Sequence, residues 1–160
     1  MTDAARGRIY LAIIAALLLV IAAMAYKFIV AGSTQTAADG RAAILLEPGE
    51  RALILREMRE FLAVLQRIDD ALARGDMQGV AKASRALGAS KAHDVPAAMM
   101  GKLPLAFKTL ALSVHSDFDT IAMDAEWTGL PRRTLAQLSE VMKKCTACHE
   151  SYRLADASRN

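Results

Sequence analysis

Apolar residues recur at intervals of three and four over most of the chain beyond residue 50, which is the spacing of helices that bury one face. The pattern predicts four such helices, at residues 50–74, 76–91, 105–125 and 132–154. Pro48 precedes the first helix and Gly75 follows it, while the Pro- and Gly-containing stretch 93–104 is expected to be irregular. We therefore expect an all-α domain, an antiparallel four-helix bundle whose core sites are built from inward-facing side chains.

The expected buried line of each helix follows from the same spacing. Two of these lines contain side chains that can bind a metal or cofactor, since the first includes a methionine and the fourth a cysteine and a histidine. In chain order the lines are Ile54, Met58, Phe61, Leu65, Ile68 and Leu72; Val80, Ala83 and Leu87; Phe107, Leu110, Val114, Phe118 and Ile121; and Leu135, Leu138, Met142, Cys145, His149 and Tyr152.

A different pattern occupies the N-terminus, where residues 9–26 form an uncharged apolar run behind Arg6 and Arg8. At about 1.5 Å per residue this run approaches the roughly 30 Å hydrocarbon core of a bilayer, and residues 28–31 extend it if Lys27 reaches out to the interface. A cleaved secretory signal is the alternative, with Ala23-Met24-Ala25 as its cleavage site, but signal cores are usually only about 7–15 residues long. We favour a retained anchor.

The chain thus divides into residues 1–31, an anchor or signal; residues 32–47, a linker that is small and polar over residues 32–40; and residues 48–160, the helical domain. Basic residues ahead of the apolar run favour a cytoplasmic N-terminus, so the domain is expected on the periplasmic side of the inner membrane, or free in the periplasm if cleavage occurs.

Charge adds one exclusion. Of 20 basic and 17 acidic residues, three basic and one acidic residue lie in the first 31, which leaves the rest of the chain nearly balanced. A nucleic-acid-binding protein needs a cationic face to displace counterions from phosphates. We therefore expect no nucleic-acid partner.

Both cysteines of the chain stand in one motif, Cys145-Thr146-Ala147-Cys148-His149. On a helix, three side chains at i, i+3 and i+4 share one face. Covalent haem attachment needs this arrangement, because each thiol must reach one vinyl group of the porphyrin while the imidazole meets the iron from the same side. The motif predicts one covalently bound haem c, with Cys145 and Cys148 attached to it and His149 as an iron ligand.

Two other uses of the motif are weaker. A redox-active dithiol normally accompanies a βαβ unit, and the sequence indicates no strands. A zinc site would need a fourth ligand, for which His93, His115 and carboxylates are the candidates.

The motif and its sequel Glu150-Ser-Tyr152-Arg153, on the last of four helices, resemble the cytochrome c′ and cytochrome c-556 family over about residues 47–156. The specific part is Cys-x-x-Cys-His-x-x-Tyr-Arg, and the rest is helix pattern. The resemblance implies thioether bonds at both cysteines, His149 as proximal ligand, and Arg153 near the haem, where it would bond a propionate or shield the proximal pocket. A solvated arginine at a helix end is the alternative for Arg153.

The distal side of the haem is where members of this family differ. In c-556-like members a methionine of the first helix fills the sixth position, and Met58 lies in that region here. Met58 could instead be plain core packing. His93 and His115 are the rival ligands, and Met99, Met100 and Met123 are expected in the core or loops.

We expect an electron carrier rather than an enzyme, with low-spin iron between His149 and Met58 and with redox partner proteins in the periplasm or membrane. The alternative is a five-coordinate protein that binds nitric oxide or carbon monoxide, as in cytochrome c′. A peroxidase is disfavoured because the first helix offers no distal histidine, arginine and acid set. A homodimer through the first two helices stays open.

Overall fold

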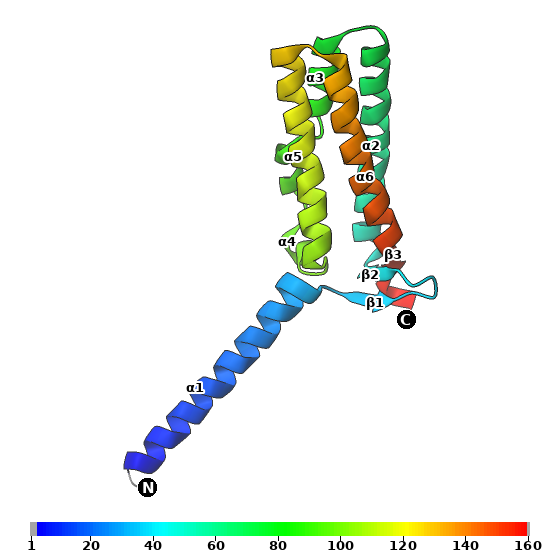
Figure 1. The fold of residues 1–160 in the computed structure, drawn as a ribbon. Helices are drawn as coiled ribbons and strands as arrows, with labels where there is room; N and C mark the ends of the chain where they lie inside the picture. Colours follow the sequence, from blue (N-terminus) through cyan, green and yellow to red (C-terminus); the bar gives the residue numbers. More distant parts are fainter. Residues whose placement is uncertain (1–2, 160) are drawn as a thin grey trace.

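A long, apolar N-terminal helix leaves the rest of the molecule at an angle (Figure 1). The computed structural model describes the backbone of residues 3–159 and the side chains of residues 6–91 and 95–158. Helix α1 (Asp3–Ala25) continues as π-helix η1 (Tyr26–Ala31), and the stretch Arg6–Ala31 is long and apolar enough to cross a membrane. Its side chains are exposed along almost the whole length, as expected of a span or a signal segment.

The rest of the chain is mostly helical, as predicted. The long helices are α2 (Pro48–Ala73), α5 (Leu105–Thr128) and α6 (Pro131–Ser151), and the shorter ones are α3 (Met77–Arg85) and α4 (Ala97–Met100), with 3-10 turns η2 (Ala89–Asp94) and η3 (Ala157–Arg159). Helix α3 packs against α2 and α5, and α5 packs against α6. Local sequence explains the starts, since Glu47 and Glu50 form a capping box on α2 and Asp76 caps α3.

The segment expected to be a linker, residues 32–47, is not irregular. It forms β1 (Thr34–Thr36) and β2 (Ala42–Leu46), which pair antiparallel, and β2 pairs parallel with β3 (Tyr152–Asp156) at the other end of the chain. The pairing is stabilised by burial, because Ala43, Ile44 and Leu46 are all in the core.

The same sheet corrects the end of the last helix, which was expected to reach residue 154. Helix α6 ends at Ser151, and Tyr152 and Arg153 belong to β3, where Ala42 pairs with Tyr152. The buried line of α6 also differs from the expected one. Thr134, Leu138 and Val141 are buried, whereas Leu135 and Met142 are about half exposed.

The apolar core is divided into two clusters. The cluster farther from α1 joins α2, α3, α5 and α6 around Ile68, Val80 and Phe118. The second, nearer α1, joins the sheet to α2, α4 and the start of α5 around Ile44, Met99 and Leu103. The space between these clusters is where the site described below lies.

The end of the N-terminal helix is fixed to the domain by direct contacts. Gly32 has φ +65° and lies so close to residues 102–104 that a Cβ there would come within 2.6 Å of the Lys102 carbonyl oxygen. The Ser33 amide donates to that carbonyl at 2.7 Å, and Lys108 Nζ donates to the Ile29 carbonyl at 2.9 Å. The apolar helix and the domain therefore meet at a defined joint.

Gly32→Ala tests this joint. With φ +65° and ψ −160°, Gly32 occupies a region that is essentially restricted to glycine, so alanine should cost about 1–3 kcal/mol from backbone strain alone. The clash with residues 102–104 should add to this loss, as measured by urea unfolding in detergent.

Gly40→Ala is the matched control, because Gly40 also has a positive φ, +83°, but has nothing within 4 Å of the added Cβ. It should lose less unfolding free energy than Gly32→Ala. Equal losses would contradict close packing at the joint.

Candidate functional site

The Cys-x-x-Cys-His motif lies on the last turns of α6, just before the chain enters β3. Cys145 and Cys148 are partly buried, and Cys145 packs against the core cluster far from α1. His149 is exposed to solvent. The three residues belong to one helical stretch, as predicted.

A largely apolar cavity of about 360 Å³ lies beside the motif, and this volume falls in the range of small-molecule and cofactor sites. Helices α2, α4, α5 and α6 all contribute to its walls. Cys145, Cys148 and His149 line it from α6, and Met58 lines it from α2. The structure thus brings together four of the five predicted site residues.

Two further methionines line the same cavity and were assigned only to core or loop from the sequence. Met99 is buried and belongs to the cluster near α1, and Met100 lies next to it on α4. Three thioether groups therefore face this space, a point that helix periodicity could not reveal because α4 lies in the stretch expected to be irregular.

Burial raises the pKa of both thiols, and for Cys148 the charge of Cys145 raises it further. Reactive dithiols need the opposite, because the thiolate is the nucleophile. This disfavours the redox-dithiol interpretation of the motif.

The described residues give the zinc interpretation no support. Among the described residues, no three His, Cys, Asp or Glu side chains are grouped so that they could hold a metal ion. Zinc needs its ligands to converge on one point. The side chain of His93, one suggested ligand, lies outside the described residues, and its backbone is in η2.

His115 lines the cavity, but both of its ring nitrogens are engaged. Nδ1 lies 2.7 Å from the Leu87 carbonyl oxygen and Nε2 lies 3.3 Å from Glu57 Oε1. An imidazole must offer a free nitrogen to an iron. His115 is therefore a poor distal ligand as it is held, and its partner Glu57 is a polar wall residue that the sequence did not single out.

Arg153 is on strand β3 rather than one helical turn beyond the motif, because β3 replaces the expected end of the helix. Its Nη1 lies 3.3 Å from Asp39 Oδ2, and Asp39 also bonds Arg41. Arg41 in turn donates to the His149 carbonyl at 3.2 Å. These exposed groups form a small charged cluster at the end of α6, and Arg153 is not among the residues that line the cavity.

Arg41 was not found from the sequence because it lies in the supposed linker. Hydrogen bonds from the Arg41 side chain, first, and from its backbone amide, second, lower the pKa of Asp39.

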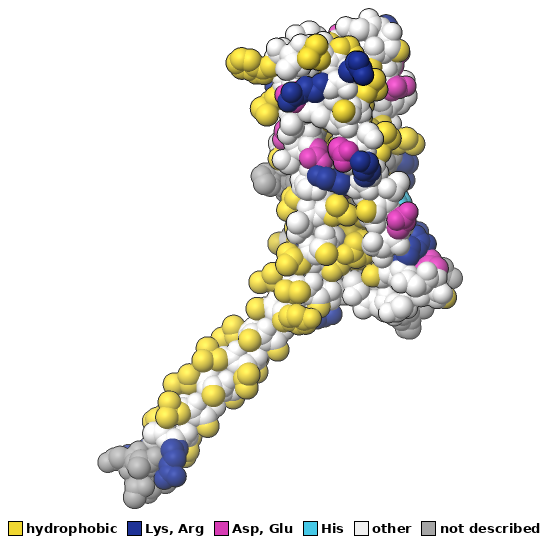
Figure 2. All heavy atoms as spheres, in the orientation of Figure 1, with side chains coloured by type: hydrophobic (Ala, Val, Ile, Leu, Met, Phe, Trp, Pro, Cys, Tyr) yellow, Lys and Arg dark blue, Asp and Glu magenta, His cyan; other side chains and the backbone are white. Residues whose placement is uncertain are grey.

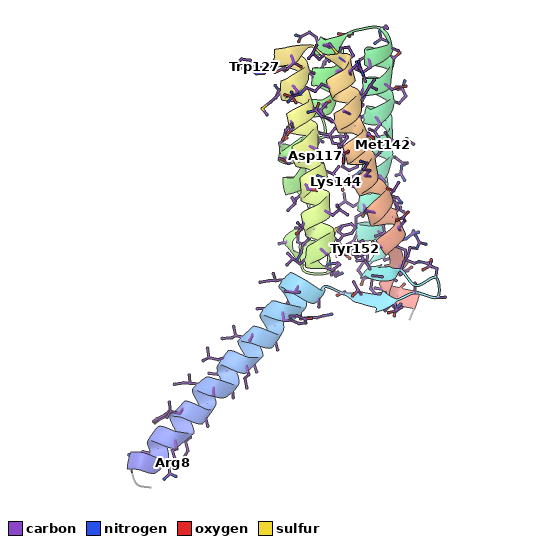
Figure 3. All side chains as sticks on the ribbon, viewed as in Figure 1. Arg8, Asp117, Trp127, Met142, Lys144 and Tyr152 are labelled. Carbon is purple, nitrogen blue, oxygen red and sulfur yellow. The ribbon has the colours of Figure 1, made fainter. Side chains whose placement is uncertain are left out.

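Two lysines also line the cavity, Lys108 on α5 and Lys144 on α6. Lys144 pairs with Asp117 on α5, and Figure 3 shows the two labelled side chains near each other between those helices. Lys108 points toward the joint described above. The cavity is thus apolar with a few charged groups on its wall.

Comparisons with models of known families, with curated proteins and with solved structures found no match. The functional argument therefore depends on the residues and geometry of this chain.

The His115–Glu57 pair makes stability depend on pH. Burial by itself lowers the pKa of His115, but hydrogen bonds to Glu57 and Leu87 and the charges of Glu57 and Asp119 outweigh burial and raise it. The resulting stabilisation is complete below the unfolded-state pKa of about 6.5 and is lost as pH rises through the higher folded-state value. Glu57→Gln should therefore cost about 1–2 kcal/mol at about pH 5.5 and clearly less at about pH 8.5, from urea unfolding.

Glu60→Gln, an exposed change on the same helix, is the control and should show no such difference. A loss in Glu57→Gln that is independent of pH would contradict the ionic contribution.

Proposed function

We propose that this chain is a c-type cytochrome that carries single electrons, with one haem c attached through Cys145 and Cys148. The observation that carries the proposal is that the attachment motif lines an apolar cavity together with Met58. In this arrangement of motif and methionine, the chain resembles the cytochrome c′ and c-556 family. We propose an electron carrier rather than an enzyme.

The walls of the cavity suit the group. A porphyrin presents two broad apolar faces, and side chains such as Ile54, Phe61, Leu65 and Val114 line the space. Apolar contact with such faces is favourable at about 25 cal/mol per Å² removed from water. Cysteines on the helix that lines the cavity can anchor an occupant along one edge.

The two proposed iron ligands come from different helices. His149 would hold the iron from α6 and Met58 from α2, and most of the side chains around them are apolar. Bound haem supplies an iron that takes up and returns one electron. Ligands from both sides change little on electron transfer, and a thioether raises the reduction potential.

The arrangement of helices supports the bundle part of the proposal. In Figure 1, α2 and α5 run away from the joint with α1, and α6 returns toward it. The connections α2–α3 and α5–α6 are short, as is typical of up-down-up-down bundles, whereas residues 86–104 form a longer connection between α3 and α5. Four-helix bundles that carry a haem motif on the last helix resemble the cytochrome c′ and cytochrome c-556 family.

We place the domain on the periplasmic side of the inner membrane, held by the Arg6–Ala31 helix. Arg6 and Arg8 at the start of the span favour this orientation. Its redox partners would be periplasmic or membrane proteins.

Covalent attachment is tested by expressing the full chain with haem-attachment machinery. The 17.2 kDa chain should keep its haem stain after denaturing electrophoresis, and the double variant Cys145→Ser, Cys148→Ser should lose it. Thr146→Ser, an exposed change between the two cysteines, should keep the stain. Absence of stain in the unaltered chain would sink the proposal, and the intact mass of the same sample reports whether the N-terminal helix is retained.

The distal ligand is tested by optical spectra of the ferric protein. We expect a low-spin spectrum with a weak sulfur-to-iron charge-transfer band, which Met58→Leu should abolish, because leucine fills the space without a ligand atom. Met100→Leu is the matched control and should leave the band in place. A high-spin spectrum in the unaltered protein would favour the five-coordinate, gas-binding alternative over electron transfer.

A further inference from the structure

The hydrophobic surface of the N-terminal helix does not stop where the helix ends. Phe28, Ile29 and Val30 of η1 are 53%, 55% and 41% exposed, and Leu105 at the start of α5 is 44% exposed. Pro96, Ala97 and Ala98 on and beside α4 are exposed as well. Figure 2 shows hydrophobic side chains running from α1 onto the adjoining end of the domain.

The joint holds these two surfaces together. A Cβ on Gly101 would come within 3.2 Å of the Phe28 ring, and Gly32 lies against residues 102–104. In Figure 1, α4 and the start of α5 lie directly beside the end of the N-terminal helix. Residues 96–105 therefore keep a fixed position relative to η1.

The length of the helix sets where a bilayer would end. Counted from Ile9, the first residue after Arg8, a hydrocarbon core of about 30 Å takes up about 20 residues at about 1.5 Å each. It therefore ends close to Phe28, and any tilt of the helix moves this boundary farther toward the domain. The headgroup layer adds roughly 5–7 Å on each side, which takes in the rest of η1 and the residues packed against it.

The distribution of charged residues agrees with this position of the bilayer boundary. Residues 95–116 contain no acidic residue and two lysines, Lys102 and Lys108. The same helix α5 carries Asp117, Asp119, Asp124 and Glu126 farther on. Most acidic and basic side chains in Figure 2 likewise lie away from α1. Lys102 is paired with Glu50 at 2.7 Å, so the end of the domain next to the helix is apolar with little net charge, as suits a lipid headgroup layer.

We propose that Pro96, Ala97, Ala98 and Leu105 form a collar that lies in the headgroup layer of the membrane leaflet facing the domain. The collar rests on the membrane-spanning part of the proposed function and not on the haem. Met99, Met100 and Leu103 within the same segment also line the cavity. The collar therefore holds the cavity beside the membrane surface, within reach of membrane-bound redox partners.

Lipid photo-crosslinking tests the collar in the full chain, inserted into phosphatidylcholine vesicles that contain a phosphatidylcholine with a diazirine near the headgroup. Peptide mass spectrometry should find adducts on residues 9–31 and on residues 96–105. None should occur on residues 123–135, which include the exposed Trp127 at the opposite end of the domain (Figure 3).

Leu105→Glu should sharply reduce the adducts on residues 96–105 and leave those on 9–31 unchanged, because a charged side chain avoids the acyl boundary. Leu135→Glu is the matched control, since Leu135 is 52% exposed on α6, and it should change neither. Adducts restricted to residues 9–31, or spread equally over residues 123–135, would overturn the collar while leaving the anchor. Absence of adducts everywhere would overturn both, and the haem stain of the same sample reports separately on the cytochrome proposal.

Discussion

The parallel pairing of β2 with β3 joins segments from opposite ends of the domain sequence, with Ala42 facing Tyr152 and Leu46 facing Asp156. Strand β2 leads directly into α2, and β3 directly follows α6. The sheet therefore holds the start of α2 and the end of α6 together, although these two helices approach each other closely at few positions. Buried Ile44 and Leu46 stabilise this tie. Together with the cluster around Phe118, which also joins α2 to α6, this pairing keeps Met58 and the Cys-x-x-Cys-His motif at the same cavity.

The divided core follows from this arrangement. Around Phe118, helices α2, α3, α5 and α6 pack together as one cluster. Around Ile44, the second cluster is built from the sheet, α2, α4 and the start of α5. The cavity draws wall residues from both clusters, Phe61 from one and Phe107 from the other. Phe107 is further fixed by the ring of Tyr152, whose centroid lies 5.4 Å away in an edge-on geometry. Tyr152, three residues beyond the motif, thus supports the cavity wall from the sheet rather than from helix α6.

Periodicity predicted what depends on neighbours three and four positions away, and failed where the partner is distant. The three long helices, and Cys145, Cys148, His149 and Met58 as neighbours of one space, were predictable because helix faces are local properties. The second helix was expected to reach residue 91 but ends at Arg85. The five-residue run Ala42–Leu46 was read as linker because its partner is more than a hundred residues away. The same distant pairing moved Arg153 off the helix and made Arg41 a neighbour of the His149 carbonyl. Met99 is buried, in keeping with the expected core or loop position, but the contribution of Met99 and Met100 to the cavity was not predicted, since loops with proline carry no period from which to infer a buried face.

The side chains around the cavity narrow the question of distal coordination. His115 lines the cavity from α5 as its described imidazole outside the motif, and its two nitrogens contact the Leu87 carbonyl and Glu57. Recruiting it would break a buried hydrogen bond, at a cost of about 1–3 kcal/mol. A thioether needs no hydrogen-bond partner when buried, so Met58 can turn toward or away from the site at little cost. For the haem that we propose, the choice at the distal position is therefore between a thioether and an open position. It is this choice, rather than the attachment chemistry, that separates an electron carrier from a gas-binding protein.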